Sequence, residues 1–176
     1  MTRQALLTLA EDLSRQNGFD AFSYADLSRA LGITKAAVHH HFPTKAALAQ
    51  ALVDDYSTRV LTELAALNGH PADQLRRFVA LYRAASADGT RLCLCVAYGA
   101  MPARQSEAVQ GAVAQFHTDV TAWLTPVTAA LPAVTLPAPA LLALVEGAQI
   151  MARAAGTIAP FDAATQPLLA QLETPV

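Results

Sequence analysis

The chain has 176 residues, with 12 Lys and Arg against 14 Asp and Glu, and its formal net charge is −2. This length fits one ordinary domain or a small domain joined to a larger one, and the charge argues against nucleic-acid binding over the whole surface. Two cysteines are too few for a disulfide framework, and neither a signal peptide nor an unbroken apolar span is present, so we expect a cytoplasmic protein without a membrane segment.

Apolar spacing and capping residues predict two helices at the start of the chain. Gly18 ends the first helix, because a glycine just past the last turn accepts a left-handed conformation. Ser23 and Asp26 form the capping box that starts the second helix, and Gly32 closes it. The apolar face of the first helix consists of Leu6, Leu9, Ala10 and Leu13.

Two more helices follow the tight turn at Gly32. Thr34 caps a short third helix, which Pro43 stops, and Thr44 caps a long fourth helix over about 45–67. The second and third helices, joined at Gly32, have the layout of a helix-turn-helix. In that motif the second helix presents its first residues to base edges in the major groove of DNA.

Helical spacing continues through the rest of the chain, with breaks at glycines and prolines. We expect further helices at about 71–87, 90–101, 104–130, 139–155 and 161–173. Pro126 lies inside the third of these and is expected to kink it or end it early. The predicted fold is therefore all-α, with about nine helices.

Positive charge is concentrated where the helix-turn-helix lies. Residues 27–53 contain Arg29, Lys35 and Lys45 and no acidic residue, whereas residues 51–176 carry seven Lys and Arg against ten Asp and Glu. A locally positive segment on an acidic body suits a small DNA-binding head. A chance gap in the acidic residues is the alternative, because three positive charges are few.

A longer motif runs through this segment. It consists of a small residue, three spacers, a glycine, an aliphatic residue and a capping residue, then a histidine group with phenylalanine, a turn and a lysine. The residues are Ser28, Gly32, Ile33, Thr34, His39-His40-His41-Phe42 and Pro43-Thr44-Lys45. The pattern resembles the TetR family of bacterial regulators over about residues 3–50. His39 stands where that family usually has tyrosine, and Ser28 where it usually has alanine.

The resemblance implies how the segment contacts DNA. Lys35 and Ala37 would face base edges, while His39, His41 and Lys45 would contact phosphates. Lys45 also stands at a helix N-terminus, which favours an anion. The predicted set of DNA-contacting residues is Tyr24, Ala25, Thr34, Lys35, Ala36, Ala37, His39, His40, His41 and Lys45. No metal site is expected, because successive helical residues point about 100° apart and the three histidines cannot share one ion.

In the TetR family a helical body follows the DNA-binding head. The resemblance therefore implies a helix-turn-helix DNA-binding domain at 1–46 and a ligand-binding and dimerisation domain at 47–176. The last two helices are expected to pair across a two-fold axis in a homodimer, which would bind a palindromic operator in double-stranded DNA. An intramolecular core accounts for part of the same apolar residues.

The segment 91–101 resembles the Cys-Leu sixth helix of a TetR subgroup, some of whose members sense electrophiles or oxidants through that cysteine. Cys93 matches the sensing position, and Met101 stands where the subgroup commonly has an acidic residue. Cys93 and Cys95 point about 200° apart on a helix, so they do not form an easy disulfide. Arg91 and a helix start near residue 90 favour a thiolate, whereas two inert core cysteines are the alternative.

A pocket for a small, mostly apolar or electrophilic effector is expected between the helices of the body. Tyr98 and His117 are the stronger candidates for its wall, because a buried polar tip needs a partner. The predicted effector-site residues are Phe78, Tyr82, Cys93, Tyr98, Met101, Phe116, His117 and Trp123. No cofactor is expected.

Together these features predict a dimeric transcriptional repressor that a ligand or a thiol modification releases from DNA, rather than an enzyme. Repression, as opposed to activation, follows from the resemblance alone. The alternatives are a cysteine-dependent redox enzyme, which the Cys-x-Cys spacing does not favour, and a helical adaptor that does not bind DNA.

Overall fold

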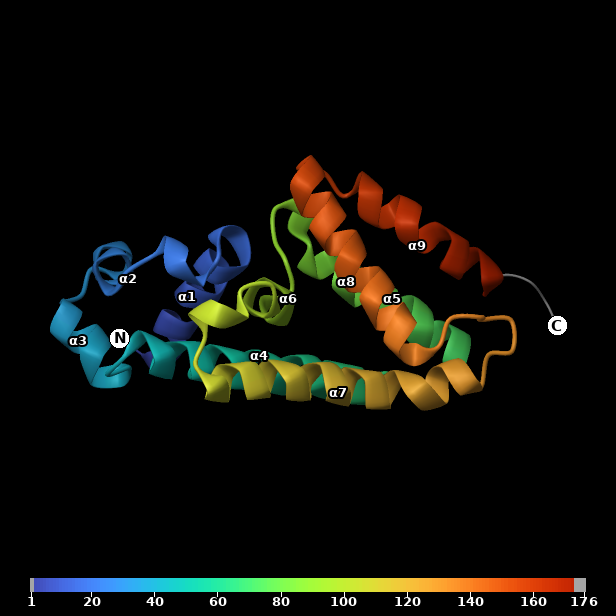
Figure 1. Cartoon of the computed structure of the whole chain (residues 1–176), viewed down its shortest axis with the longest axis horizontal. Coiled ribbons are helices and arrows are strands. Elements are labelled where there is room, and N and C mark those ends of the chain that lie inside the picture. Colours follow the sequence, from blue (N-terminus) through green and yellow to red (C-terminus); the bar gives the residue numbers. More distant parts are fainter. Residues whose placement is uncertain (1, 173–176) are drawn as a thin grey trace. The chain divides into compact units, whose positions relative to one another are not determined.

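The computed structural model describes residues 2–172, and all regular secondary structure in this range is helical (Figure 1). No strand occurs in these residues, so the predicted all-α fold is confirmed. The nine α-helices of the described range are α1 (Arg3–Asn17), α2 (Tyr24–Leu31), α3 (Lys35–His41), α4 (Lys45–Ala66), α5 (Pro71–Ala85), α6 (Leu94–Gly99), α7 (Glu107–Ala129), α8 (Ala138–Ala155) and α9 (Ala159–Gln171). Short 3-10 segments are η1 (Phe19–Ala21), η2 (Ala87–Gly89) and η3 (Pro102–Arg104).

The helices form two compact units, and each unit is discontinuous in the sequence. The first unit contains the described residues up to Thr58 together with Leu94–Gln115. The second unit contains Arg59–Cys93 and the described residues from Phe116 onward. Helices α4 and α7 therefore each begin in the first unit and end in the second. The division at residues 46 and 47 concerns function and stays a prediction.

The residues that were predicted to cap the helices near the N-terminus make the expected capping hydrogen bonds. Ser23 Oγ accepts from the N–H of Asp26, whose carboxylate accepts in return from the N–H of Ser23 at 2.9 Å. Thr34 Oγ1 and Thr44 Oγ1 each accept from the N–H three residues later, at 3.2 and 3.1 Å. Caps of this kind contribute about 1 kcal/mol each, so α2, α3 and α4 begin where local chemistry sets them.

The core of the first unit includes α6 as well as the helices of the predicted head. Tyr98 on α6 is only 1% exposed, and its hydroxyl lies 3.2 Å from Ser14 Oγ on α1. The ring centroid of Tyr98 is 5.2 Å from that of Phe19 in η1. The buried aliphatic residues of the first unit include Leu6, Leu7, Leu27, Val38, Leu48 and Leu52. Each buried leucine stabilises the unit by about 2 kcal/mol, so α6 shares a hydrophobic core with α1.

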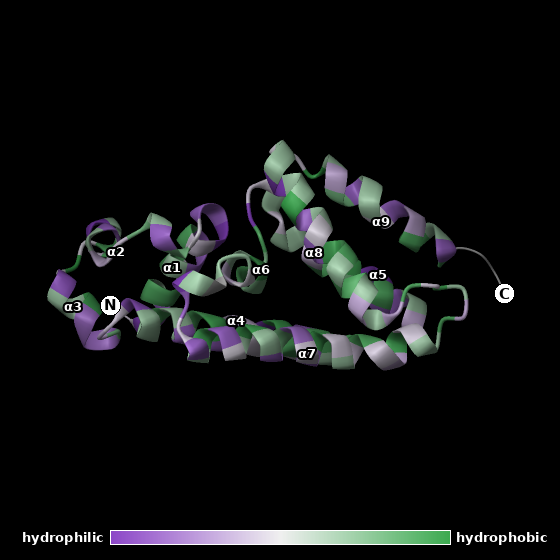
Figure 2. Ribbon diagram, in the orientation of Figure 1, coloured by the Kyte–Doolittle hydropathy of each residue, from purple (hydrophilic) through white to green (hydrophobic). Residues whose placement is uncertain are grey.

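In the second unit α8 packs against α5 and α9. Figure 2 shows α8 largely in green, the colour of hydrophobic residues. Its one fully buried polar side chain among the described residues is Gln149, whose Oε1 accepts from the N–H of Cys93 at 2.9 Å and whose Nε2 donates to Tyr82 O at 2.8 Å. Arg83 on α5 makes a bidentate ion pair with Asp162 on α9, at 2.6 and 2.8 Å.

The start of α6 differs from the prediction. The helix begins at Leu94 rather than near residue 90, so Cys93 precedes it instead of lying within it. Ala87 and Asp88 have positive φ angles of 42° and 58°, which interrupt the helical backbone. The buried Gln149 side chain then binds the N–H of Cys93. Because this hydrogen bond comes from a residue far along the chain, the local sequence pattern did not reveal it and placed the start of α6 too early.

Helix α7 corrects the expectation for Pro126. The helix continues through that proline to Ala129, so the prediction that Pro126 could end the helix early is wrong. Pro126 lies on the exposed side of α7, where the carbonyl that loses its helical partner can bind water. Leu124 and Val127, on either side of it, are buried and hold the helix against the rest of the second unit.

Candidate nucleic-acid interface

The turn between α2 and α3 has the geometry that a helix-turn-helix needs. Gly32 has φ of 63° and ψ of 34°, the left-handed region that a glycine enters without cost from a side chain. The next N–H, of Ile33, donates to Ser28 O at 3.0 Å. Ser28 is buried beside this turn, and its hydroxyl donates to Ala25 O at 3.0 Å. A serine therefore fills the position where alanine is usual without leaving a buried polar atom unpaired.

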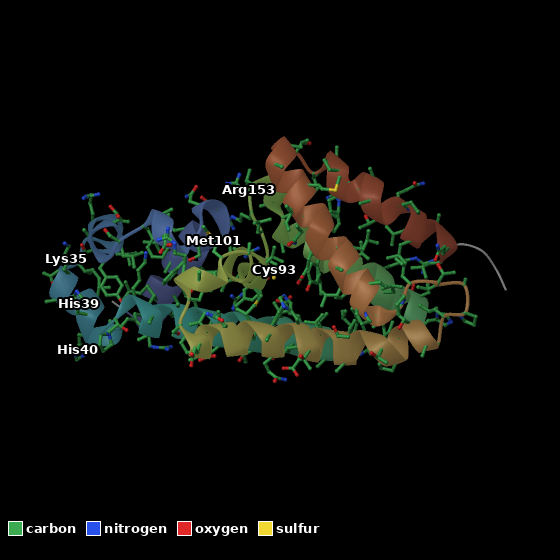
Figure 3. The ribbon with its side chains drawn as sticks, viewed as in Figure 1. Lys35, His39, His40, Cys93, Met101 and Arg153 are labelled. Carbon is green, nitrogen blue, oxygen red and sulfur yellow. The ribbon has the colours of Figure 1, made fainter. Side chains whose placement is uncertain are left out.

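The first turn of α3 presents its side chains to solvent. Lys35 and Ala36 are exposed and Ala37 is half-buried, while Val38 is fully buried and anchors the helix. In the part of the chain that the structure describes, Lys35 has no ion pair, and Figure 3 shows it at the outer end of α3. A capped helix start with a free cation is suited to base edges and phosphates.

Tyr24 at the start of α2 braces the segment between α3 and α4. Its hydroxyl lies 2.9 Å from Phe42 O and 2.7 Å from Thr44 O, and both carbonyls accept from it. Burial raises the pKa of Tyr24 to about 12, so the hydroxyl stays protonated at neutral pH. The hydroxyl that was expected near DNA thus holds the backbone that positions the next helix.

Lys45 at the start of α4 is held by aromatic rings. Its Nζ lies 4.6 Å from the ring centroid of Phe19 and 4.9 Å from that of Phe22, and 3.9 Å from Asp20 Oδ1. Desolvation lowers the pKa of Lys45, and the Asp20 carboxylate opposes that shift. The ammonium group is therefore fixed in place, but part of its charge is offset within the protein.

A shallow groove joins these groups on the first unit. It has a volume of about 500 Å³, and its lining residues are Asp20, Phe22, Ser23, Tyr24, Ala25, Lys35, His39 and Lys45. Five of the residues predicted to contact DNA line it, from α2, α3 and the start of α4. The groove carries more positive than negative side chains, and a DNA backbone strand has the complementary charge.

The three histidines occupy the last turn of α3. His39 is exposed, its ring centroid lies 4.8 Å from that of Tyr24, and its Nδ1 lies 3.3 Å from Pro43 O. The rings of His40 and His41 meet edge to face at 5.5 Å. No cluster of three His, Cys, Asp or Glu side chains with metal-binding geometry occurs among residues 2–172.

The comparisons with known proteins agree with this geometry. A sequence profile described as "Bacterial regulatory proteins, tetR family" matches residues 6–52. The structure is similar to a TetR-family transcriptional regulator from Agrobacterium tumefaciens, with 32% sequence identity, a TM-score of 0.85 and coverage of 96% of both chains. The chain belongs to the TetR family of transcriptional regulators. It is thus a DNA-binding regulator rather than an enzyme or an adaptor.

Two further solved structures share the TetR-family fold. One is a TetR regulator from Legionella pneumophila, with 22% identity, a TM-score of 0.83 and coverage of 97% of this chain and 96% of that chain. The other is NemR from E. coli in its reduced form, with 24% identity, a TM-score of 0.79 and full coverage of both chains. No curated protein sequence matches the chain significantly.

The residues predicted to line an effector site of this TetR-family regulator fall in both units. Tyr98 and Met101 belong to the first unit, where Tyr98 is buried and Met101 is 50% exposed (Figure 3). The second unit holds the other six. Within it the ring of Phe78 lies 4.9 Å from that of Tyr82 and stacks at 5.9 Å on Trp123. These aromatic residues form one cluster in the structure.

Polar groups of α8 that the sequence did not single out accompany this cluster. His117 Nε2 lies 3.3 Å from Glu146 Oε1. The contact with the Glu146 carboxylate raises the pKa of His117, desolvation opposes the shift, and a negative Cys93 would add to it. Glu146 and the buried Gln149 are one helical turn apart in a helix that is otherwise almost uncharged. This spacing of two polar residues in an apolar helix is the sequence feature that could have identified both of them as candidate site residues.

Cys93 and Cys95 are free thiols, and both are buried. Cys93 directly precedes the N-terminus of α6, and Cys95 lies in the first turn of that helix. Of the helices within residues 2–172, none has the length and hydropathy needed to span a bilayer.

Proposed function

We propose that this TetR-family regulator is a homodimeric repressor that binds a palindromic operator through α3. The observation that carries the proposal is the capped, solvent-facing start of α3 behind the left-handed turn at Gly32, where Lys35 has no ion pair with any residue of the range 2–172. In this assignment Lys35, Ala36 and Ala37 contact base edges. The lysine reaches guanine or phosphate oxygens, and the alanine methyl groups contact thymine methyl groups.

The remaining contacts are to the DNA backbone and fix the protein's register. His39, His41 and Lys45 contact phosphates, supported by their position around or beside the groove. The DNA strand that carries these phosphates also passes next to Tyr24, Ala25, Thr34 and His40. The Tyr24 hydroxyl serves this contact indirectly, by holding the carbonyls of Phe42 and Thr44.

Selection of duplexes from a random-sequence library by the full chain tests this proposal and yields the operator. We expect a palindromic site, and we expect Lys35→Ala to weaken binding to it by about 1–3 kcal/mol and to relax the preference at one base pair in each half-site. Arg77→Ala, an exposed change on α5, serves as the matched control and retains full affinity. A selection without enrichment, or an unaffected Lys35→Ala variant, would contradict the proposal.

The exposed face of α8 supports a homodimer. Ile150 and Met151 are 49% and 58% exposed, and a second copy of the chain would remove them from water. Other uncharged residues continue the same face at helical spacing, namely Ala143, Leu144, Gly147 and Ala154. By contrast, Leu141, Leu142 and Val145 are buried inside the second unit and contribute to its own core. The small residues allow two helices to approach closely across a two-fold axis.

The effector is proposed to act at the second unit near Cys93, with the cluster of Phe78, Tyr82 and Trp123 as its apolar surroundings. Phe116 and His117 belong to the same unit, and in its protonated form His117 would favour a thiolate at Cys93. Cys93 is also the last residue of the second unit before α6, which belongs to the first. A modification there would act where the chain passes from one unit to the other.

N-Ethylmaleimide is a suitable probe of thiol sensing. The Cys93 thiolate would add to the maleimide double bond, forming a sulfur–carbon bond while the neighbouring carbon takes up a proton. We expect modified protein to lose affinity for the selected duplex, and we expect Cys93→Ser, but not Cys95→Ser, to abolish that loss. Mass spectrometry that finds Cys93 fully modified with unchanged affinity would reject thiol sensing and leave a reversible apolar ligand as the effector.

A further inference from the structure

We propose that His39 binds a DNA phosphate only in its doubly protonated form, so that each head takes up one proton when the regulator binds its operator. This inference rests on the proposed DNA-binding function. It adds a chemical condition to one contact, because the histidine side chain differs from the tyrosine usual at this position in how it can donate a hydrogen bond.

The hydrogen bond of Nδ1 sets this condition. His39 Nδ1 lies 3.3 Å from Pro43 O. A carbonyl oxygen can only accept, so Nδ1 carries a proton and is the donor. In a neutral imidazole the other nitrogen, Nε2, then has a lone pair and no proton. A phosphate oxygen is also only an acceptor, and it cannot form a hydrogen bond with that lone pair.

A second proton changes Nε2 from an acceptor to a donor. The imidazolium then keeps its bond to Pro43 O and offers an N–H and a positive charge to the phosphate, which is the stronger, charge-assisted type of hydrogen bond. The Tyr24 ring, whose centroid lies 4.8 Å from that of His39, holds the imidazole from the α2 side. The carbonyl and the ring together fix which nitrogen is left for DNA.

The charged groups around His39 come from each element at the groove. Lys35 on α3 and Lys45 at the start of α4 are positive, and Asp20 in η1 is negative. Asp20 lies 3.9 Å from Lys45 and 3.7 Å from Arg104, while Tyr24 on α2 remains neutral because its pKa is about 12. On the exposed side of α2, Asp26 and Arg29 pair with each other at 3.1 Å.

This arrangement links the proton to the DNA. Without DNA, the groove has two lysines against one carboxylate, and a further positive charge gains no partner there. A bound phosphate supplies the missing negative charge and favours the imidazolium. His40 and His41 are the neighbouring histidines, and the test must separate them from His39.

The experiment measures the affinity of the full chain for a fluorescent duplex selected from the random-sequence library, between about pH 6 and 8 at constant ionic strength. We expect wild-type affinity to fall as the pH rises, approaching about tenfold per pH unit for each head at the alkaline end, because one proton is released with the DNA. Calorimetry in phosphate and in Tris buffers, which differ in ionisation enthalpy, counts the protons directly.

Two substitutions at the exposed His39 position isolate its contribution. His39→Tyr and His39→Gln both offer a donor that needs no extra proton, since a tyrosine hydroxyl stays protonated up to about pH 10. We expect each variant to bind the duplex, with about one proton fewer per head and a correspondingly flatter pH dependence. Thermal melts monitored by circular dichroism verify that both variants are folded.

Three results distinguish the outcomes. If both His39 variants keep the wild-type proton count, the inference is wrong although the protein binds DNA. If His40→Gln or His41→Gln removes the pH dependence instead, the proton belongs to that histidine and the inference is likewise overturned. If the selection enriches no duplex, the proposed function fails before His39 is tested.

Discussion

Gln149→Leu is expected to destabilise the second unit strongly without altering the surface that we propose to face DNA. The side chain is fully buried and bonds two backbone groups, the N–H of Cys93 at 2.9 Å and the carbonyl of Tyr82 at 2.8 Å. Leucine has nearly the same volume, so the substitution leaves little cavity. Its effect therefore comes from lost hydrogen bonds rather than from lost packing.

The two backbone groups do not contribute equally to the loss. The Tyr82 carbonyl keeps a second partner, because the hydroxyl of Ser86 donates to it at 3.0 Å. The Cys93 N–H loses the hydrogen bond that Gln149 supplies, and the loss of a bond to a buried donor costs about 1–3 kcal/mol. The lost bond from Gln149 to the Tyr82 carbonyl adds the contribution of one ordinary hydrogen bond. We therefore expect the free energy of unfolding to fall by about 2–4 kcal/mol in total.

Urea and thermal denaturation at one fixed protein concentration measure this loss, since the proposed dimerisation would make apparent stability depend on concentration. For a chain of this size the midpoint temperature should fall by about 5–12 °C. The exposed glutamine of α7, changed in Gln115→Leu, is the matched control and should shift stability by less than about 0.5 kcal/mol. If Gln149→Leu lowers the free energy of unfolding by less than about 1 kcal/mol, the two hydrogen bonds of Gln149 do not stabilise the second unit as expected.

Three further predictions follow from the same structure. Gly32→Ala should cost about 1 kcal/mol of stability by denaturation, through backbone strain alone, because an added Cβ meets no atom within 4 Å. Ile150→Glu should convert the dimer to monomers in sedimentation experiments, while Ala122→Glu on the exposed side of α7 should not. Because Glu146 raises the pKa of His117, the pair stabilises the fold below the pKa of unfolded histidine, about 6.5, and this contribution disappears as the pH rises through the raised pKa. A His117→Gln variant should lack that part of the pH dependence in denaturation midpoints.

Local chemistry explains why the N-terminal part of the chain was predictable. The Ser23 capping box, the left-handed Gly32 and the Thr34 cap each depend on residues within four positions of one another. Such interactions form in the same way whatever surrounds them, so a motif of this kind predicts both the helix boundaries and the exposed start of α3. The family followed from the same short segment.

Long-range contacts explain what was missed. The contacts of Lys45 with the rings of Phe19 and Phe22, which hold its ammonium group, were not foreseen, and its contact with a phosphate stays a prediction. The start of α6 depends on Gln149, which lies 56 residues further along the chain than Cys93. The hydroxyl of Tyr98 lies against Ser14 of α1, a partner that the sequence did not indicate, while its place in an effector site stays a prediction. No periodicity encodes these partners, because each depends on how separate helices pack.

The sequence by itself determined the helical class, the helix-turn-helix and the side chains that α3 presents at its exposed start, since all of these arise from spacing and capping along one stretch of chain. Tertiary structure alone decided that the Tyr24 ring packs against His39, that α6 joins the core of the first unit, and that Cys93 meets Gln149. These features require a ring, a hydroxyl or an amide brought from elsewhere in the fold. They bear most directly on how binding and release would be controlled.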